Sequence, residues 1–202
     1  MPTDTTDASA APPLVLGSTS PYRRELLSRL RLPFTTAAPQ VDETPLPHET
    51  PAAPARRLAL AKAPQVPARP PQAIVIGAAQ VAALAAEPLG KPGSHERAVA
   101  QLQRMSGQTV VFQTALSVVC LASGFEQSEL APVEVRFRAL DAGEIERYLR
   151  AEQPYDCAGS AKSEGLGIAL LEAIHNDDPT ALVGLPLIRT ARLLRAAGLR
   201  LP

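Results

Sequence analysis

The chain has 202 residues, which is long enough for one well-buried domain, and its 20 Lys and Arg residues balance its 20 Asp and Glu residues. A formal net charge of zero gives no support to bulk electrostatic binding of nucleic acid or of a membrane surface, so any phosphate site must rest on locally placed charge. The two cysteines, Cys120 and Cys157, are too few for a disulfide framework and lack metal-ligand spacing, which favours a reducing, cytoplasmic compartment.

The first residues of the chain differ in composition from the rest. Residues 1–13 contain Asp4 and Asp7 but neither a basic segment nor an apolar core, so we expect a disordered tail and not a signal peptide. No later apolar run approaches the length of a membrane span. The sequence therefore predicts one domain over residues 14–202.

The first motif of that domain predicts a strand, a small-residue loop and the start of a helix. Leu14-Val15-Leu16 is apolar, Gly17-Ser18-Thr19 forms the loop, and Ser20-Pro21 suits a helix N-cap followed by a first-turn proline. Free N–H groups at such a helix start attract anions, and Arg23 and Arg24 in the first turn would strengthen the attraction. The alternative is an ordinary surface helix with solvated arginines.

The remaining elements alternate between helices and strands. We expect a helix over residues 52–63 with Thr50 as its N-cap, further helices capped by Ser94 and Asp141, and a last helix over residues 187–197 closed by Gly198. Strands are expected at 73–77, 80–84, 109–121, 133–137, 168–174 and 182–184. Mixing βα units with an antiparallel meander predicts an α/β fold with a mixed β-sheet and flanking helices.

Several charged residues lie at turns bounded by glycine or proline, where their positions are restricted. The basic ones are Lys62, Lys91 and Lys162, and the acidic candidates are Asp42, Glu43 and Glu164. Clustered cations with a few carboxylates suit hydrolysis of a nucleotide polyphosphate, in which carboxylates hold a metal or orient water. Each lysine taken alone is more commonly a solvated surface residue. The three histidines show no ligand-like spacing, and neither cysteine has a visible base partner.

Taken in order, these segments resemble the Maf family of nucleotide pyrophosphatases over residues 14–198. The matching pieces are Ser18-Thr19-Ser20-Pro21 with Arg23-Arg24, Val41-Asp42-Glu43, Leu60-Ala61-Lys62-Ala63, Ile76-Gly77, Gly90-Lys91-Pro92, Met105-Ser106-Gly107 and Val183-Gly184-Leu185-Pro186-Leu187. The resemblance implies a Maf/ITPase-like fold with two lobes around a nucleotide-binding cleft.

Within the family, the chain is more similar to the branch that hydrolyses 7-methyl-GTP. Tyr22, Gln80 and Glu164 stand where members acting on dTTP and UTP have arginine, threonine and glutamine. Methylated guanine is cationic, and an aromatic face such as that of Tyr22 attracts a cation by about 0.5–2 kcal/mol. A carboxylate such as Glu164 can accept hydrogen bonds from the guanine N–H edge, which a pyrimidine lacks.

The implied reaction is attack of water on a nucleoside triphosphate to give the monophosphate and pyrophosphate, assisted by a divalent metal cation (Mg or Mn). The resemblance assigns phosphate binding to the serine loop, with Ser18 and Ser20, and to the cations Arg23, Arg24, Lys62 and Lys91. It assigns the holding of a metal or a water molecule to Glu43, and it places both Glu43 and Lys91 among the catalytic residues. The implied partner is the triphosphate substrate, without nucleic acid or membrane. A homodimer is compatible with the sequence, which carries no signal for oligomeric state.

One position departs from the family pattern. Ala79, in Gly77-Ala78-Ala79-Gln80, occupies the place of the aspartate that the family uses as general base, and a methyl group can neither accept a proton nor bind a metal. Ala85-Ala86 also replaces an Asp-Gly-like turn. Three explanations follow: a natural member of low activity in which Glu43 or Asp42 partly substitutes, a pseudoenzyme that still binds nucleotide, or a deliberately inactivated variant. The non-enzyme alternative is a nucleotide-binding protein in cell-division (septum) control.

Overall fold

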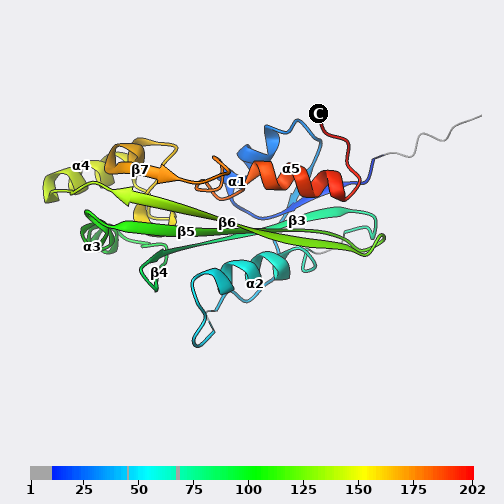
Figure 1. Cartoon of the computed structure of the whole chain (residues 1–202), viewed down its shortest axis with the longest axis horizontal. Helices are drawn as coiled ribbons and strands as arrows, with labels where there is room; N and C mark the ends of the chain where they lie inside the picture. The colour runs from blue at the N-terminus through cyan, green and yellow to red at the C-terminus, as the bar shows by residue number, and fades with distance from the viewer. Residues whose placement is uncertain (1–10, 45, 67–68) are drawn as a thin grey trace, which may run out of the picture.

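A mixed seven-stranded sheet forms the centre of the molecule (Figure 1). The structure is a computed structural model that describes residues 11–44, 46–66 and 69–202, so the predicted tail at 1–13 lies mostly outside the described residues. The strands run in the order β2-β1-β3-β5-β6-β7, and β4 pairs with β3. They span Leu14–Gly17 (β1), Thr35–Ala37 (β2), Ile74–Leu84 (β3), Glu87–Leu89 (β4), Thr109–Cys120 (β5), Phe125–Phe137 (β6) and Leu171–His175 (β7).

Helices cover both faces of this sheet. Figure 1 shows α2 on one face and both α1 and α5 on the other, while α3 and α4 lie towards one end of the long β5–β6 pair. The helices span Pro21–Ser28 (α1), Ala52–Lys62 (α2), His95–Met105 (α3), Ala142–Glu152 (α4) and Leu187–Ala196 (α5). β1 pairs in parallel with β2 and β3, whereas β3, β5, β6 and β7 pair antiparallel. The predicted α/β class with a mixed sheet is confirmed.

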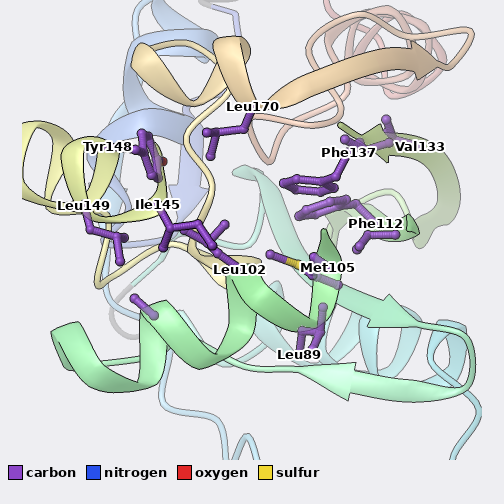
Figure 2. Close-up of a cluster of buried hydrophobic side chains, with 14 of the residues drawn as sticks. Leu89, Leu102, Met105, Phe112, Val133, Phe137, Ile145, Tyr148, Leu149 and Leu170 are labelled. Atoms are coloured by element: carbon purple, nitrogen blue, oxygen red, sulfur yellow. The ribbon is translucent and has the colours of Figure 1, made fainter. Parts of the chain in front are cut away.

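The apolar core is divided between the two ends of the sheet. At one end, α1 and α5 pack on β1, β3 and β5 through buried side chains such as Leu26, Ile76 and Leu194. At the other end, α3 and α4 bury Leu102 and Leu149 in a cluster that also contains Phe112 and Phe137. Figure 2 shows Phe112 and Phe137 side by side in this cluster, with Leu149 on its far side. These two clusters are the cores of the two lobes, and two smaller buried clusters lie where α2 packs against the sheet. Within the described part of the chain, no helix is long and apolar enough to span a membrane.

Helix starts largely follow the predicted caps. The hydroxyl oxygens of Ser20 and Ser94 accept from the backbone N–H three residues on, and Asp141 forms a full capping box with Glu144. The prediction for Thr50 is wrong: Pro51 is the N-cap residue of α2, and no side chain caps this helix. The Thr50 backbone carbonyl instead accepts from the Ala53 N–H at 2.9 Å, so a tight turn leads into the helix.

Several strand predictions need correction, and the strand expected at 133–137 begins earlier, at Phe125 of β6. Residues 73–77 and 80–84 belong to one strand, because β5 pairs with β3 continuously from Ile74 to Leu84. Residues 182–184 form turns, since the carbonyls of Ala181 and Leu182 accept from a glutamine side chain and not from a neighbouring strand. β7 begins only at Leu171, because Leu166–Leu170 form a 3₁₀ turn.

Gly77 lies within β3 at the point where helix α2 packs directly against the strand. A Cβ at this position would lie 2.3 Å from the Ala59 carbonyl oxygen and 2.9 Å from the Ala63 nitrogen. We therefore expect Gly77→Ala to lower the free energy of unfolding by about 3 kcal/mol, near the upper end of overpacking effects. Urea denaturation measures this, with Gly90→Ala as control, because a Cβ at Gly90 meets nothing within 4 Å. Equal stability of the two variants would contradict the packing of α2 on β3.

Candidate active site

A cavity of about 470 Å³ lies beside the exposed edge of β3. β1 stops at Gly17, opposite Gly77, and β4 joins β3 only from Ala82 onward, so the edge between these pairings is open. Side chains from both lobes line the cavity, including Ser18 and Phe112. A cavity of this size is typical of small-molecule sites.

The serine loop forms one wall of the cavity. Its start requires glycine, because a Cβ at Gly17 would lie 2.9 Å from Cγ2 of Val66. The Ser18 hydroxyl oxygen accepts from the Ser20 N–H at 3.2 Å and from Nη1 of Arg23 at 3.4 Å. Arg23 also donates from Nε to the Gly184 carbonyl at 2.9 Å. Loop and arginine are therefore held in place before any ligand arrives.

Three cations converge on the cavity: Arg23, Lys62 and Lys91. Lys62, in the last turn of α2, is 8% exposed, and its Nζ pairs with Oε1 of Glu43 at 2.7 Å. Burial lowers the pKa of Lys62, Glu43 offsets part of this effect, and the nearby charges of Arg23 and Lys91 lower the pKa further. Burial also lowers the pKa of Arg23 to about 10, which leaves it charged at neutral pH. We call Arg23, Lys62 and Lys91 the cation cluster.

Arg24 is separated from the cation cluster. It lines a different cavity, on the other side of the serine loop, together with Glu25 and Phe34. Successive residues of a helix point about 100° apart, and of the two arginines only Arg23 lines the cavity that contains the cation cluster. The structure therefore brings the predicted site residues together around one cavity, with the exception of Arg24, Asp42 and Lys162, which do not line it.

Ala79 and Gln80 lie on opposite faces of β3 at the open edge. Ala79 is 4% exposed and packs with Leu58 and Ala59 of α2, while its methyl group reaches the cavity. Nε2 of Gln80 donates to Oγ1 of Thr114 at 2.8 Å and to the carbonyls of Ala181 and Leu182 at 3.1 and 2.9 Å. The Gln80 amide nitrogen is thus engaged in holding the 181–184 turn, which lines the cavity.

Another part of the cavity wall contains Tyr22 and Glu164. Nζ of Lys162 lies 5.6 Å from the centroid of the Tyr22 ring, so one ring face already has a cation. Burial, followed by the nearby Cys157 and Asp156, raises the pKa of Tyr22 to about 12, which keeps its hydroxyl protonated at neutral pH. A base could therefore stack only on the other face of Tyr22.

Some residues lining the cavity were not predicted as site residues: Asp156, Cys157 and the turn at Leu182, Val183 and Gly184. Burial raises the pKa of the Cys157 thiol to about 12, so it is not a nucleophile at neutral pH. The sequence signal for the turn was present in Val183-Gly184-Leu185-Pro186, but its apolar character predicted a strand.

The sequence of this chain is similar to those of a known protein family. A family model described as "Maf-like protein" matches residues 13–197. The chain belongs to the Maf family. A Maf protein of Polaromonas sp. (strain JS666) named 7-methyl-GTP pyrophosphatase is 74% identical over 94% of this chain and 86% of its own length.

Two further Maf relatives carry the same name. The protein of Albidiferax ferrireducens is 65% identical over 93% of this chain and 94% of its own length. That of Nitrosococcus oceani is 56% identical over 94% of this chain and 96% of its own length. The similarity thus spans both lobes and the cavity between them.

The donor set of this Maf chain does not fit a metal held by the protein alone. Among residues 11–44, 46–66 and 69–202, no three His, Cys, Asp or Glu side chains come together as metal ligands. Ala79 offers no donor atom, and Glu43 is already paired with Lys62. No step of the reaction is therefore assigned to a metal, and the metal role expected for Glu43 stays a prediction.

Proposed function

We propose that the cavity binds 7-methyl-GTP and that the chain hydrolyses it to 7-methyl-GMP and pyrophosphate at a rate reduced by Ala79. The observation that carries this proposal is the convergence of Arg23, Lys62 and Lys91 beside the serine loop. Positioned cations and backbone N–H groups are the groups that bind polyphosphates. Relatives that match nearly the whole chain and are named 7-methyl-GTP pyrophosphatases support the choice of substrate.

The cation cluster would bind the phosphates, with Ser18 and Ser20 of the serine loop at the helix start. Hydrolysis breaks the anhydride between the α- and β-phosphates, and the leaving pyrophosphate gains negative charge that Arg23 and Lys91 can stabilise. Lys62 would contribute in the same way, and its partner Glu43 would orient water. A positioned group that takes the proton from this water is missing at Ala79.

The guanine base of the nucleotide would lie against the wall that contains Tyr22 and Glu164. The free face of Tyr22 offers a stacking surface for the methylated ring, and the Glu164 carboxylate offers acceptors to the guanine N–H edge. Gln80, whose amide nitrogen is engaged with the protein, would present its carbonyl oxygen.

Ala79 also favours a second function, in which the chain binds nucleotide without turning it over and acts in cell-division (septum) control. The cation cluster does not depend on the missing aspartate, so the chain would still bind the nucleotide even without hydrolysing it. We further propose one domain over residues 14–202 and, from the free Cys120 and Cys157, a cytoplasmic location.

The proposed base site is tested by Glu164→Gln. Because a glutamine side chain cannot offer two acceptor oxygens, the preference for 7-methyl-GTP over UTP should fall about tenfold. Isothermal titration calorimetry measures both affinities. The matched control is Glu126→Gln, on β6 and outside the lining of the cavity. Unchanged preference in the Glu164 variant would contradict the placement of the base.

A further inference from the structure

A partly buried ion pair between Glu152 and Lys162 lies next to the Tyr22 ring. Nζ of Lys162 is 2.9 Å from Oε1 of Glu152, and the same ammonium lies over the Tyr22 ring. The side chains of Glu152 and Lys162 are 15% and 27% exposed, so neither is freely solvated. Tyr22 lines the cavity, whereas Glu152 does not.

The position of Glu152 has no explanation in the stability of its own helix. It is the last residue of α4, where a negative charge opposes the helix dipole. The Glu152 carboxylate is stabilised instead by the neighbouring 161–167 loop. Its second oxygen, Oε2, accepts a hydrogen bond from the Leu166 N–H at 2.7 Å. Both carboxylate oxygens are thus engaged by the same loop.

The loop is shaped to receive this carboxylate. A Cβ at Gly165 would lie 2.6 Å from Oε2 of Glu152, so the close approach requires glycine. At Gly167 a Cβ would lie 2.6 Å from the Lys162 carbonyl oxygen, because the loop folds back on itself. The Lys162 N–H also donates to the Tyr148 hydroxyl of α4 at 3.0 Å. Ser163 and Glu164, which line the cavity, lie inside this anchored loop.

We propose that Glu152 is a positioning residue that sets the charge selectivity of the base site by holding and neutralising Lys162 over Tyr22. This inference rests on the proposed function, in which a cationic base stacks on the free face of Tyr22. An unneutralised ammonium behind that ring would repel a methylated, cationic guanine and leave neutral guanine unaffected. The Glu152 carboxylate removes this repulsion and holds Glu164 at the cavity wall.

The two partners of the pair should therefore change selectivity in opposite directions. Glu152→Gln leaves the Lys162 charge uncompensated, so the affinity for 7-methyl-GTP should fall about tenfold relative to that for GTP. Lys162→Met leaves the Glu152 charge uncompensated, so the same ratio should rise. The double variant should return the ratio to within about twofold of the unaltered chain.

Calorimetric titration of the full chain at pH 6, where the methylated base keeps its positive charge, tests these expectations. The ligands are 7-methyl-GTP, GTP and inorganic tripolyphosphate, the last of which reports on the cation cluster alone. Tripolyphosphate affinity should stay within about twofold in each variant. The control Glu172→Gln removes an exposed ion pair to Arg136 on the surface and should change nothing.

Equal losses for 7-methyl-GTP and GTP in Glu152→Gln would overturn the proposal and make Glu152 a purely structural residue. If that variant fails to fold, Lys162→Met decides alone, and a ratio that does not rise overturns the proposal. A failure of the proposed function can be told apart from a failure of this proposal. In that case the unaltered chain would bind tripolyphosphate as tightly as 7-methyl-GTP.

Discussion

Replacing Ala79 by aspartate is expected to raise the rate of pyrophosphate release from 7-methyl-GTP by about 10²–10⁴-fold, the usual contribution of a positioned general base. Ala79 lies at the open edge of β3, and its methyl group reaches the cavity that contains the cation cluster. A carboxylate there would be stabilised by Arg23, Lys62 and Lys91 while it accepts the proton of the attacking water. Steady-state release of pyrophosphate measures the change.

The matched control is Ala79→Asn, which has nearly the same size but no basic carboxylate. It should leave the rate within about threefold of that of the unaltered chain. Equal rates in the aspartate variant and the unaltered chain would show that the general base is another residue, with Glu43 as the next candidate. Equal activation by asparagine would show that side-chain volume at this position, and not proton transfer, limits the reaction.

Lys62→Met is expected to weaken triphosphate binding about 10²-fold. The variant loses a charge-assisted contact, worth about 1.5–3 kcal/mol, and leaves Glu43 without the ammonium that it contacts at 2.7 Å. The unpaired carboxylate then repels the phosphates. Adding Glu43→Gln should therefore recover about tenfold of the loss, which calorimetric titration with tripolyphosphate measures.

Arg24→Met provides the control for this effect. The sequence assigns Arg24 to the phosphates together with Arg23, whereas the structure places it in a separate cavity. The variant should change tripolyphosphate affinity by no more than about threefold. A loss as large as that of Lys62→Met would contradict the division between the two arginines.

Local signals predict the local parts of the site. Ser20 with Pro21 predicts the start of α1 because a cap depends on neighbouring residues, and the same holds for Ser94 and Asp141. The chemical departure at Ala79 is also evident from the sequence, because it concerns which atoms a side chain carries.

Long-range contacts are what the sequence leaves open. The turn at 181–184 looks like a strand until Gln80, about a hundred residues earlier, is seen to bind its carbonyls. Arg23 and Arg24 are equivalent in sequence, and only the packing of α1 decides which one faces the cavity. The acidic end of α4 has no local rationale, because Glu152 is engaged by a loop that begins nine residues later.

We propose that the phosphate site of this chain is intact while the general base beside it is missing. The most direct test of this claim is to incubate the unaltered chain with a substoichiometric amount of 7-methyl-GTP, measure binding by calorimetry and then determine which nucleotide is present. We predict that the nucleotide binds and is recovered mainly as the triphosphate over a time in which the Ala79→Asp variant converts all of it. Absence of binding, or equally fast conversion by both proteins, would contradict the claim.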